Sequence, residues 1–142
     1  MKFIVYAQEN NQIAVASVIE EFQEVIEDIV HKIVPPNAPY KIVESLDVDN
    51  TFFNAYEFDQ STGAIINMEK AKEIWKNKFR ETRKPILENL DIEYMKALED
   101  NNVVKQQEIA SMKQQLRDVT AVELPDNLED LKNTWPSILV TD

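Results

Sequence analysis

The 142-residue sequence has no cysteine, a single glycine and a single histidine. Without cysteine the chain forms no disulfides, thiolate nucleophiles or thiolate metal sites, and this composition is typical of a reducing cytoplasm. One glycine is too few for the glycine-rich loops that hold phosphates and dinucleotides. One histidine and no cysteine also disfavour the nucleophile and base pairs of acyl transfer. We therefore expect a protein that is not an enzyme and that has no cofactor.

Long apolar runs and positive charge are scarce as well. No stretch approaches the roughly eighteen consecutive apolar residues that cross a bilayer, and the N-terminus lacks a signal-peptide core. We expect a soluble protein with no membrane partner. The chain has 15 basic and 26 acidic residues, a formal net charge of −11. Because lysine and arginine supply the affinity for a phosphate backbone, nucleic acid is not an expected partner.

The charge is distributed unevenly along the chain. Residues 1–67 have 3 basic and 11 acidic side chains, whereas residues 68–142 have 12 and 15. The strand-like segments also end near Asn67. We therefore predict an N-terminal α+β lobe over residues 1–67 and a helical lobe over residues 68–142.

The first part of the N-terminal lobe has the pattern of a β-hairpin followed by a helix. Two apolar runs, Phe3–Ala7 and Gln12–Ala16, flank a short polar segment, as the strands of a hairpin do. Ser17 and Glu20 have the spacing of a capping box, and apolar residues follow at helical intervals. This pattern predicts one amphipathic helix over residues 18–31.

Prolines separate this helix from further strands. Pro35, Pro36 and Pro39 end the helix because proline lacks the backbone amide and disfavours a helical residue before it. Tyr40–Val43 and Asn54–Phe58 then have strand composition. A turn at residues 59–63 contains the only glycine, Gly63, for which we predict a positive φ. The lobe is thus expected to be a small antiparallel sheet with one helix.

After Asn67 the apolar residues recur at helical spacing. One stripe runs from Met68 to Leu98, and Pro85 either kinks this helix or begins the next. A polar break at Asp100–Asn102 precedes a second helix. Its expected seam consists of Ile109, Met112, Leu116 and Val119. We predict a helical hairpin, followed by a short helix over residues 127–133.

Acidic residues offer few candidates for metal binding. His31 follows Glu27 and Asp28 at helical spacing, but a metal ion requires further protein ligands, and a histidine near a helix C-terminus is a common surface feature. The loop that contains Asp47 and Asp49 lacks the glycine and the closing glutamate of a calcium loop. We interpret these groups as solvated surface and expect no metal site.

The most informative cluster alternates aromatic and cationic residues on one predicted helix. Trp75 and Phe79 lie among Lys76, Arg80 and Arg83. Tryptophan and arginine contribute strongly to protein interfaces, so the cluster is a candidate binding surface. The alternative is that both rings are core residues while the cations face water.

Ion pairing is a second interpretation of the two arginines. Within the hairpin, Arg80 and Arg83 have Asp91 and Asp118 as candidate partners. An exposed pair contributes at most about 1 kcal/mol, so it would set geometry more than stability.

Several short segments of the helical lobe form a family-like pattern. They are Phe79–Arg83, Ile86–Leu87, Leu90–Asp91 and Met112–Val119. Together they resemble the phage tail assembly chaperone family over about residues 68–136, and Gln115–Val119 is the sharpest part. The sequence departs from that pattern at Tyr94–Met95, where the family commonly has Asp-Trp, and at Met112–Lys113, where it has Tyr-Arg. Residues 34–57 look like the lead-in of small phage proteins encoded near tail genes.

The resemblance implies a protein that escorts a phage tail or tail-fibre polypeptide in the host cytoplasm, without a cofactor. We expect the helical lobe to bind this partner through Trp75, Phe79, Arg80, Arg83, Arg117 and Asp118. The alternative is a minor structural component retained in the virion tail. A third hypothesis, from a different class, is a small hydrolase that uses surface carboxylates, and it requires a concave pocket.

Overall fold

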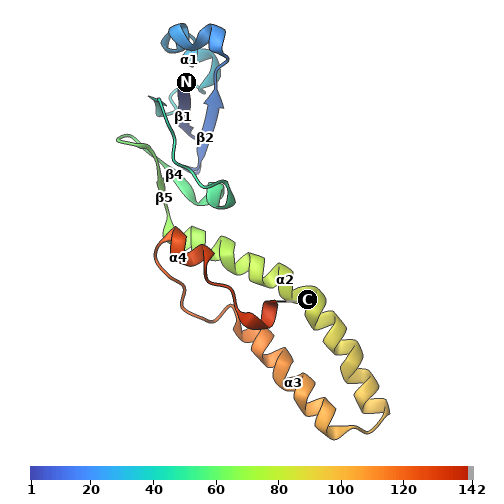
Figure 1. Ribbon diagram of the computed structural model, residues 1–142. Coiled ribbons are helices and arrows are strands. Elements are labelled where there is room, and N and C mark those ends of the chain that lie inside the picture. Colours follow the sequence, from blue (N-terminus) through green and yellow to red (C-terminus); the bar gives the residue numbers. More distant parts are fainter. Residues whose placement is uncertain (141–142) are drawn as a thin grey trace. The chain divides into compact units, whose positions relative to one another are not determined.

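The computed structural model describes residues 1–140, in two compact units, Met1–Ala71 and Lys72–Asp142 (Figure 1). The first unit contains five strands and one α-helix, and the second is helical. The predicted α+β class is confirmed. The boundary predicted at Asn67 lies between strand β5 (Gly63–Ile66) and helix α2 (Met68–Glu99), whereas the compact units divide in the first turn of α2.

The first unit begins with a three-stranded antiparallel sheet. Strand β1 (Phe3–Ala7) lies between β2 (Ile13–Ser17) and β3 (Tyr40–Val43). Val15 of β2 is opposite Val5 of β1. Asn11 has a φ of 63° in the tight β1–β2 turn, a conformation that asparagine tolerates. The predicted hairpin and third strand are confirmed, with β2 one residue later than expected.

The single helix predicted for residues 18–31 is wrong in its first half. Ser17 ends β2 and forms no cap, and a 3₁₀ helix η1 (Glu20–Val25) precedes α1 (Ile26–Ile33). The side chain of Gln23 explains the change. Its Nε2 donates to the Val18 carbonyl over 2.5 Å, and its Oε1 accepts from the Lys2 backbone N–H over 2.5 Å. These bonds tie the segment to the start of β1 and replace the capping box.

Helix α1 supplies the core on one face of the three-stranded sheet. Ile26 and Val30 of α1 pack in a buried cluster with Ile4 of β1, Val18 and Val34. Ile26 and Val30 are four residues apart and so lie on one face of the helix. The helix ends before the prolines, as predicted, but at Ile33, two residues later than expected.

Strands β4 (Tyr56–Asp59) and β5 form a second antiparallel sheet. Strand β5 was not predicted. The N–H of Phe58 donates to the Asn11 carbonyl over 3.0 Å and joins β4 to the first hairpin. Strand β4 starts later than expected because a 3₁₀ helix η2 (Asn50–Ala55) precedes it. Gly63 has the predicted positive φ, 93°, and a Cβ there would lie 3.3 Å from Cγ1 of Val43.

The second unit is built on a helical hairpin, as predicted. Helix α2 continues through Pro85 without interruption and is followed by α3 (Val103–Asp118). Asn102 caps α3 by accepting from the Lys105 N–H over 3.1 Å, and Asn101 adopts a φ of 54° in the turn. The chain then returns through α4 (Leu128–Lys132) and a 3₁₀ turn η3 (Ser137–Leu139).

The core of the second unit draws on each of these elements. The most buried apolar residues include Phe79, Leu90, Ala97, Ile109, Leu116, Leu131 and Leu139. Met112 was expected in the seam of α3, but its side chain is 41% exposed, so that part of the prediction is wrong. Ile109 and Leu116 are seven residues apart and lie on the inner face, whereas Met112 lies about 50° around the helix from them, at the edge of that face.

Candidate functional site

The aromatic residues predicted to bind a partner pack mainly against each other and the C-terminal segment. The ring centroids of Trp75 and Phe79 are 6.3 Å apart, and Trp135 lies 5.9 Å from Trp75 and 5.2 Å from Phe79. All three contacts are edge-on, a favourable geometry for aromatic pairs. Nε1 of Trp75 donates to the Thr134 carbonyl over 2.7 Å. The cluster joins the start of α2 to the end of the chain.

The burial of these rings decides between the two interpretations of the sequence. Phe79 is fully buried and Trp75 is partly buried, so the rings belong to the core of the second unit. The assignment of Phe79 to a partner-binding surface is wrong, because its side chain presents no area to solvent. The sequence analysis did not predict that Trp135 belongs to this cluster. Trp135 reaches Trp75 and Phe79 only because the chain folds back along α2 after α3.

Arg83 has a structural role at the end of α3. Its Nη1 donates to the carbonyls of Leu116 and Arg117, over 3.2 and 3.1 Å. The last carbonyls of a helix lack intrahelical partners and carry partial negative charge. A guanidinium supplies hydrogen-bond donors to these carbonyls and a positive charge beside them. Arg83 thereby attaches α3 to α2 near the base of the hairpin.

The other predicted contact residues are more exposed, but their predicted ion pairs are absent. Arg80 pairs with Glu73 over 2.6 Å. Asp91 pairs with Lys113 over 2.5 Å. Asp118 accepts from Nε2 of Gln114 over 2.9 Å, and Arg117 donates to Oε1 of the same residue over 3.4 Å. The predicted pairing of Arg80 and Arg83 with Asp91 and Asp118 is wrong, because nearer groups satisfy all four.

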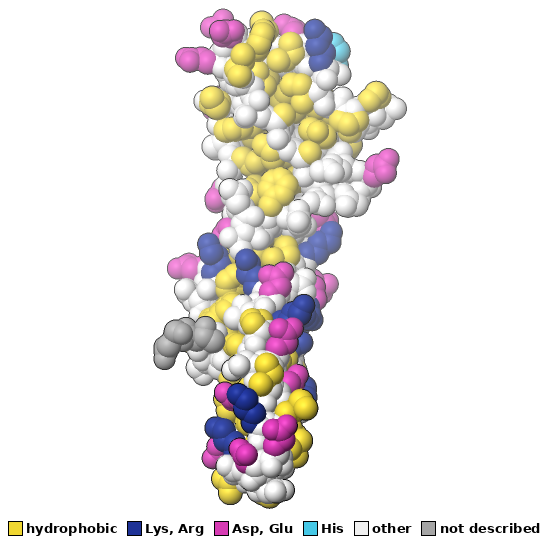
Figure 2. All heavy atoms as spheres, turned by 90° about the vertical axis from the view of Figure 1, so that its right-hand side faces the viewer, with side chains coloured by type: hydrophobic (Ala, Val, Ile, Leu, Met, Phe, Trp, Pro, Cys, Tyr) yellow, Lys and Arg dark blue, Asp and Glu magenta, His cyan; other side chains and the backbone are white. Residues whose placement is uncertain are grey.

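The strongest candidate for a contact surface lies at the opposite end of the hairpin. Five large apolar side chains there are between 48% and 67% exposed. They are Ile92, Met95 and Leu98 of α2 and Val103 and Val104 of α3, and we call them the tip surface. On α2, Ile92 and Met95 lie on the side turned away from the buried Leu90 and Ala97, and Leu98 lies between these two sides. Figure 2 shows apolar side chains among charged ones on this part of the hairpin.

Acidic groups predominate around the tip surface. Residues 88–113 contain six acidic and three basic side chains. Two of the basic groups, Lys105 and Lys113, already pair with acidic partners within the hairpin. Among the described residues, no ion pair holds Glu88, Glu99 or Asp100. The surface therefore combines exposed apolar area with an excess of negative charge.

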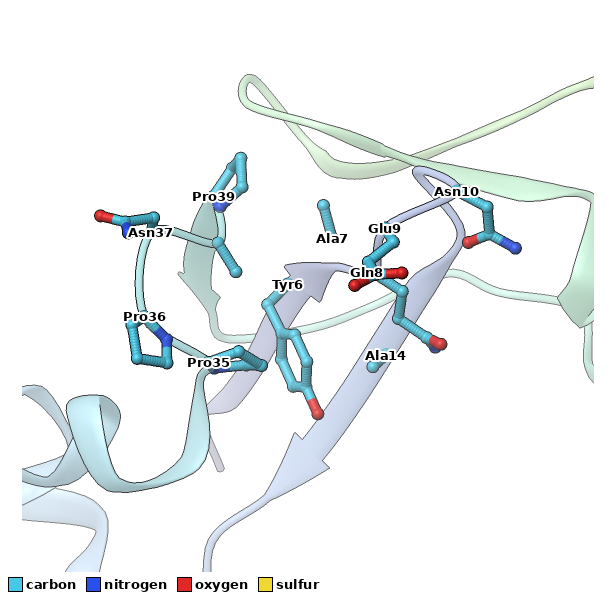
Figure 3. A pocket seen from close by; sticks show the side chains of 11 residues that line it. Tyr6, Ala7, Gln8, Glu9, Asn10, Ala14, Pro35, Pro36, Asn37 and Pro39 are labelled. Atoms are coloured by element: carbon cyan, nitrogen blue, oxygen red, sulfur yellow. The ribbon is translucent and has the colours of Figure 1, made fainter.

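The first unit has an open hollow beside the turn of its first hairpin (Figure 3). It has a volume of about 890 Å³, and Tyr6, Ala14 and three prolines form its apolar wall. Its amides are partly engaged. Nε2 of Gln8 donates to the Ile13 carbonyl over 3.1 Å, and Oδ1 of Asn10 accepts from the Gln12 N–H over 3.0 Å. The hollow can receive an apolar side chain against this wall.

Two further hollows of the first unit contain pairs of carboxylates. Glu20 and Glu44 line one, and Glu27 and Asp28 line the other. Both are wide open to solvent, which gives these groups no dry site for acid and base chemistry. Within residues 1–140, no group of three or more His, Asp or Glu side chains could hold a metal ion.

Two carboxylates of the β4–β5 hairpin have lowered pKa values. The hydrogen bond from Asn67, over 2.7 Å, lowers the pKa of Glu57, and Lys70 at 3.3 Å adds to the effect. The hydroxyl and the amide of Thr62 donate to Asp59 over 2.9 and 3.0 Å and lower the pKa of that carboxyl. Each bond favours the charged form. These groups stabilise the hairpin and its junction with α2.

No family model, curated protein or solved structure matches this chain. The resemblance to tail assembly chaperones therefore depends on the sequence segments described above. None of the helices within residues 1–140 combines the length and the apolar character that crossing a membrane requires.

Proposed function

We propose that this protein is a phage tail or tail-fibre assembly chaperone that binds an unassembled polypeptide through the tip surface. The observation that supports this most is the exposure of Ile92, Met95, Leu98, Val103 and Val104 at the free end of a helical hairpin. Exposed apolar side chains that gather at one end of an element are typical of a site that another macromolecule covers. The protein acts by binding, with no cofactor.

The chemistry of the tip surface defines the segment that it binds. Its apolar side chains favour a partner with an apolar face, and the surrounding acidic excess favours lysine or arginine beside that face. Met95 is unbranched and adapts to partners of different shape. The charged rim is exposed to water, so salt weakens this part of the attraction and binding stays reversible. Reversibility is what a chaperone requires, because its client must later join the tail.

The predicted contact residues have a supporting role in this proposal. The cluster of Trp75, Phe79 and Trp135 and the contacts of Arg83 hold α2, α3 and the C-terminal segment together at the base. The buried Ala97 and Ile109 continue the core from this base toward the tip. Arg117 and Asp118 lie at this base, away from the tip surface.

Co-expression with the tail-fibre protein of the same phage tests the proposal. The variant Met95→Ser with Val104→Ser removes the two most exposed members of the tip surface. We expect the soluble yield of the fibre protein to fall to the level seen without this chain. The matched control is Val122→Ser, which removes a 44% exposed valine elsewhere in the same unit.

Two results would count against the proposal. One is a fibre protein that folds and trimerises equally well when this gene is deleted. The other is full activity of the double variant, with circular dichroism showing that it is folded. Mass spectrometry of washed virions separates a chaperone from a structural component, since only the latter is expected in stoichiometric amounts.

A further inference from the structure

The 3₁₀ helix η1 of the first unit has an exposed apolar side. Its N-cap, Ile19, is followed by Phe22 and Val25 at intervals of three, and a 3₁₀ helix has three residues per turn, so these side chains line one side. The Phe22 N–H donates to the Ile19 carbonyl over 2.9 Å and closes the first turn. The three side chains are 60%, 46% and 40% exposed, and we call them the η1 stripe.

The 3₁₀ geometry is what leaves this stripe outside the core. In an α-helix, Phe22 would lie on the same face as Ile26, four residues later, and Ile26 is buried against the three-stranded sheet. The side chain of Gln23 fixes the segment instead, because it bonds to the N–H and the carbonyl of Lys2, over 2.5 and 3.3 Å. The fold therefore keeps large apolar side chains exposed on one side of an element, which is typical of a surface that a partner covers.

The charge around the η1 stripe is negative. Residues 17–30 contain five acidic side chains and no basic one. Three of the acidic residues flank the stripe, with Glu20 on one side and Glu21 and Glu24 on the other, and all three are exposed. Lys2 and Glu20 line the same open hollow. Within residues 1–140, none of these three carboxylates forms an ion pair, so their charge is available to a partner.

This charge decides which kind of partner fits. A second copy would bring the same carboxylates against each other, and nucleic acid or an anionic lipid surface would be repelled as well. A polypeptide segment that has apolar side chains beside lysine or arginine complements both the stripe and its flanks. We propose that the η1 stripe is a docking surface for such a segment. The inference does not depend on the tip surface, which lies in the other unit.

An NMR titration of the full chain tests this proposal residue by residue. The probe is a synthetic peptide of leucine and lysine at helical spacing, and its counterpart has glutamate in place of lysine. We expect the lysine peptide to shift the amide signals of residues 18–28, and the glutamate peptide to leave them unchanged. Because the signals are assigned to residues, binding at the tip surface is read separately.

Variants separate the apolar part of the surface from its charge. Phe22→Ser with Val25→Ser should weaken binding at residues 18–28 at least about tenfold, since it removes apolar area. Glu21→Gln with Glu24→Gln should weaken it about three- to fivefold, as expected for two exposed ion pairs. The matched control is Ile65→Ser, at a 56% exposed site of the same unit, which should leave the affinity unchanged.

Three results would overturn the proposal, and none of them requires a variant. The first is the absence of shifts at residues 18–28 with millimolar lysine peptide. The second is equal binding of the two peptides there, which would mean that charge does not select the partner. The third is a change of these signals with protein concentration in the absence of peptide, which would identify a second copy as the occupant.

Discussion

The two ends of the helical hairpin differ in what covers their apolar side chains. At the base, Phe79 is fully buried by rings from α2 and the C-terminal segment, and Arg83 satisfies the last carbonyls of α3. At the tip, Met95 and Val104 are 63% and 67% exposed. A hairpin that is stabilised at its base can keep an apolar tip available for binding, at the expense of solubility. The comparison separates residues that hold the unit together from residues that are free to contact a partner.

The largest expected change in stability comes from removing a buried ring at the base of the hairpin. Phe79→Ala should destabilise the second unit by about 3–5 kcal/mol, because it removes a fully buried ring and leaves a cavity. Both tryptophans of the chain, Trp75 and Trp135, lie in this unit, so tryptophan fluorescence during urea unfolding reports on it alone. Phe22→Ala, at a 46% exposed site of the first unit, is the control and should leave this transition unchanged. A loss under about 1 kcal/mol for Phe79→Ala would mean that the ring is not a core residue.

A change in the first unit tests whether the two units are stabilised separately. Gly63→Ala should destabilise the first unit by about 1–2 kcal/mol, because an alanine side chain is strained at a φ of 93° and contacts Val43. The tryptophan transition of the second unit should keep its midpoint. Amide exchange of residues in β1 measures the loss, and Ser61→Ala in the same turn is the control. An equal shift of both units would indicate that they unfold together.

Two single arginine substitutions compare a residue that joins α2 to α3 with one that contacts only its own helix. Arg83→Met should destabilise the second unit by about 1 kcal/mol, because the carbonyls of Leu116 and Arg117 lose a charged donor. Arg80→Met should have a smaller effect, since Arg80 is partly exposed and bonds only to side chains of its own helix. Urea unfolding followed by tryptophan fluorescence measures both variants. The opposite order would contradict the structural role given to Arg83.

The smallest effect concerns the acid stability of the first unit. The pKa values of Glu57 and Asp59 are lowered in the folded state from ordinary values of 4.5 and 3.8. Their stabilising contribution is therefore fully present above the ordinary values and is lost as the pH falls through the lowered ones. The double variant Glu57→Gln with Asp59→Asn should show a weaker dependence of unfolding on pH below about 4.5. Unchanged dependence would mean that the hydrogen bonds of Asn67 and Thr62 do not favour the charged forms.

Much of this fold could be predicted from the sequence, because local chemistry determines it. The strands of the first hairpin, the proline stop after α1, the positive φ of Gly63 and the break at Asp100–Asn102 depend on neighbouring residues alone. The start of α1 was mispredicted because Gln23 accepts a hydrogen bond from Lys2, 21 residues away, and a capping box describes only near neighbours. Strand β5 was missed because its four residues follow a turn and precede a long helix.

The candidate site was harder to predict than the fold. The alternation of aromatic and cationic residues near Trp75 is compatible with a buried core or with an exposed surface. The rings are buried because they pack against Trp135, which lies in the C-terminal segment far away in the sequence. The tip surface did leave a signal. Ile92 and Met95 are apolar on the side of α2 opposite Leu90 and Ala97, so that part of the helix is apolar on two sides. A second apolar stripe on one helix predicts a second contact.

Site-specific photo-crosslinking during co-expression with the tail-fibre protein tests the binding claim most directly. A photoreactive residue in place of Met95, which is 63% exposed, lies in the tip surface, and one in place of Val122, which is 44% exposed, lies outside it. The account predicts a covalent adduct with the fibre protein from position 95 and none from position 122. Adducts from position 122 alone, or from neither position while the two proteins still co-purify, would contradict it.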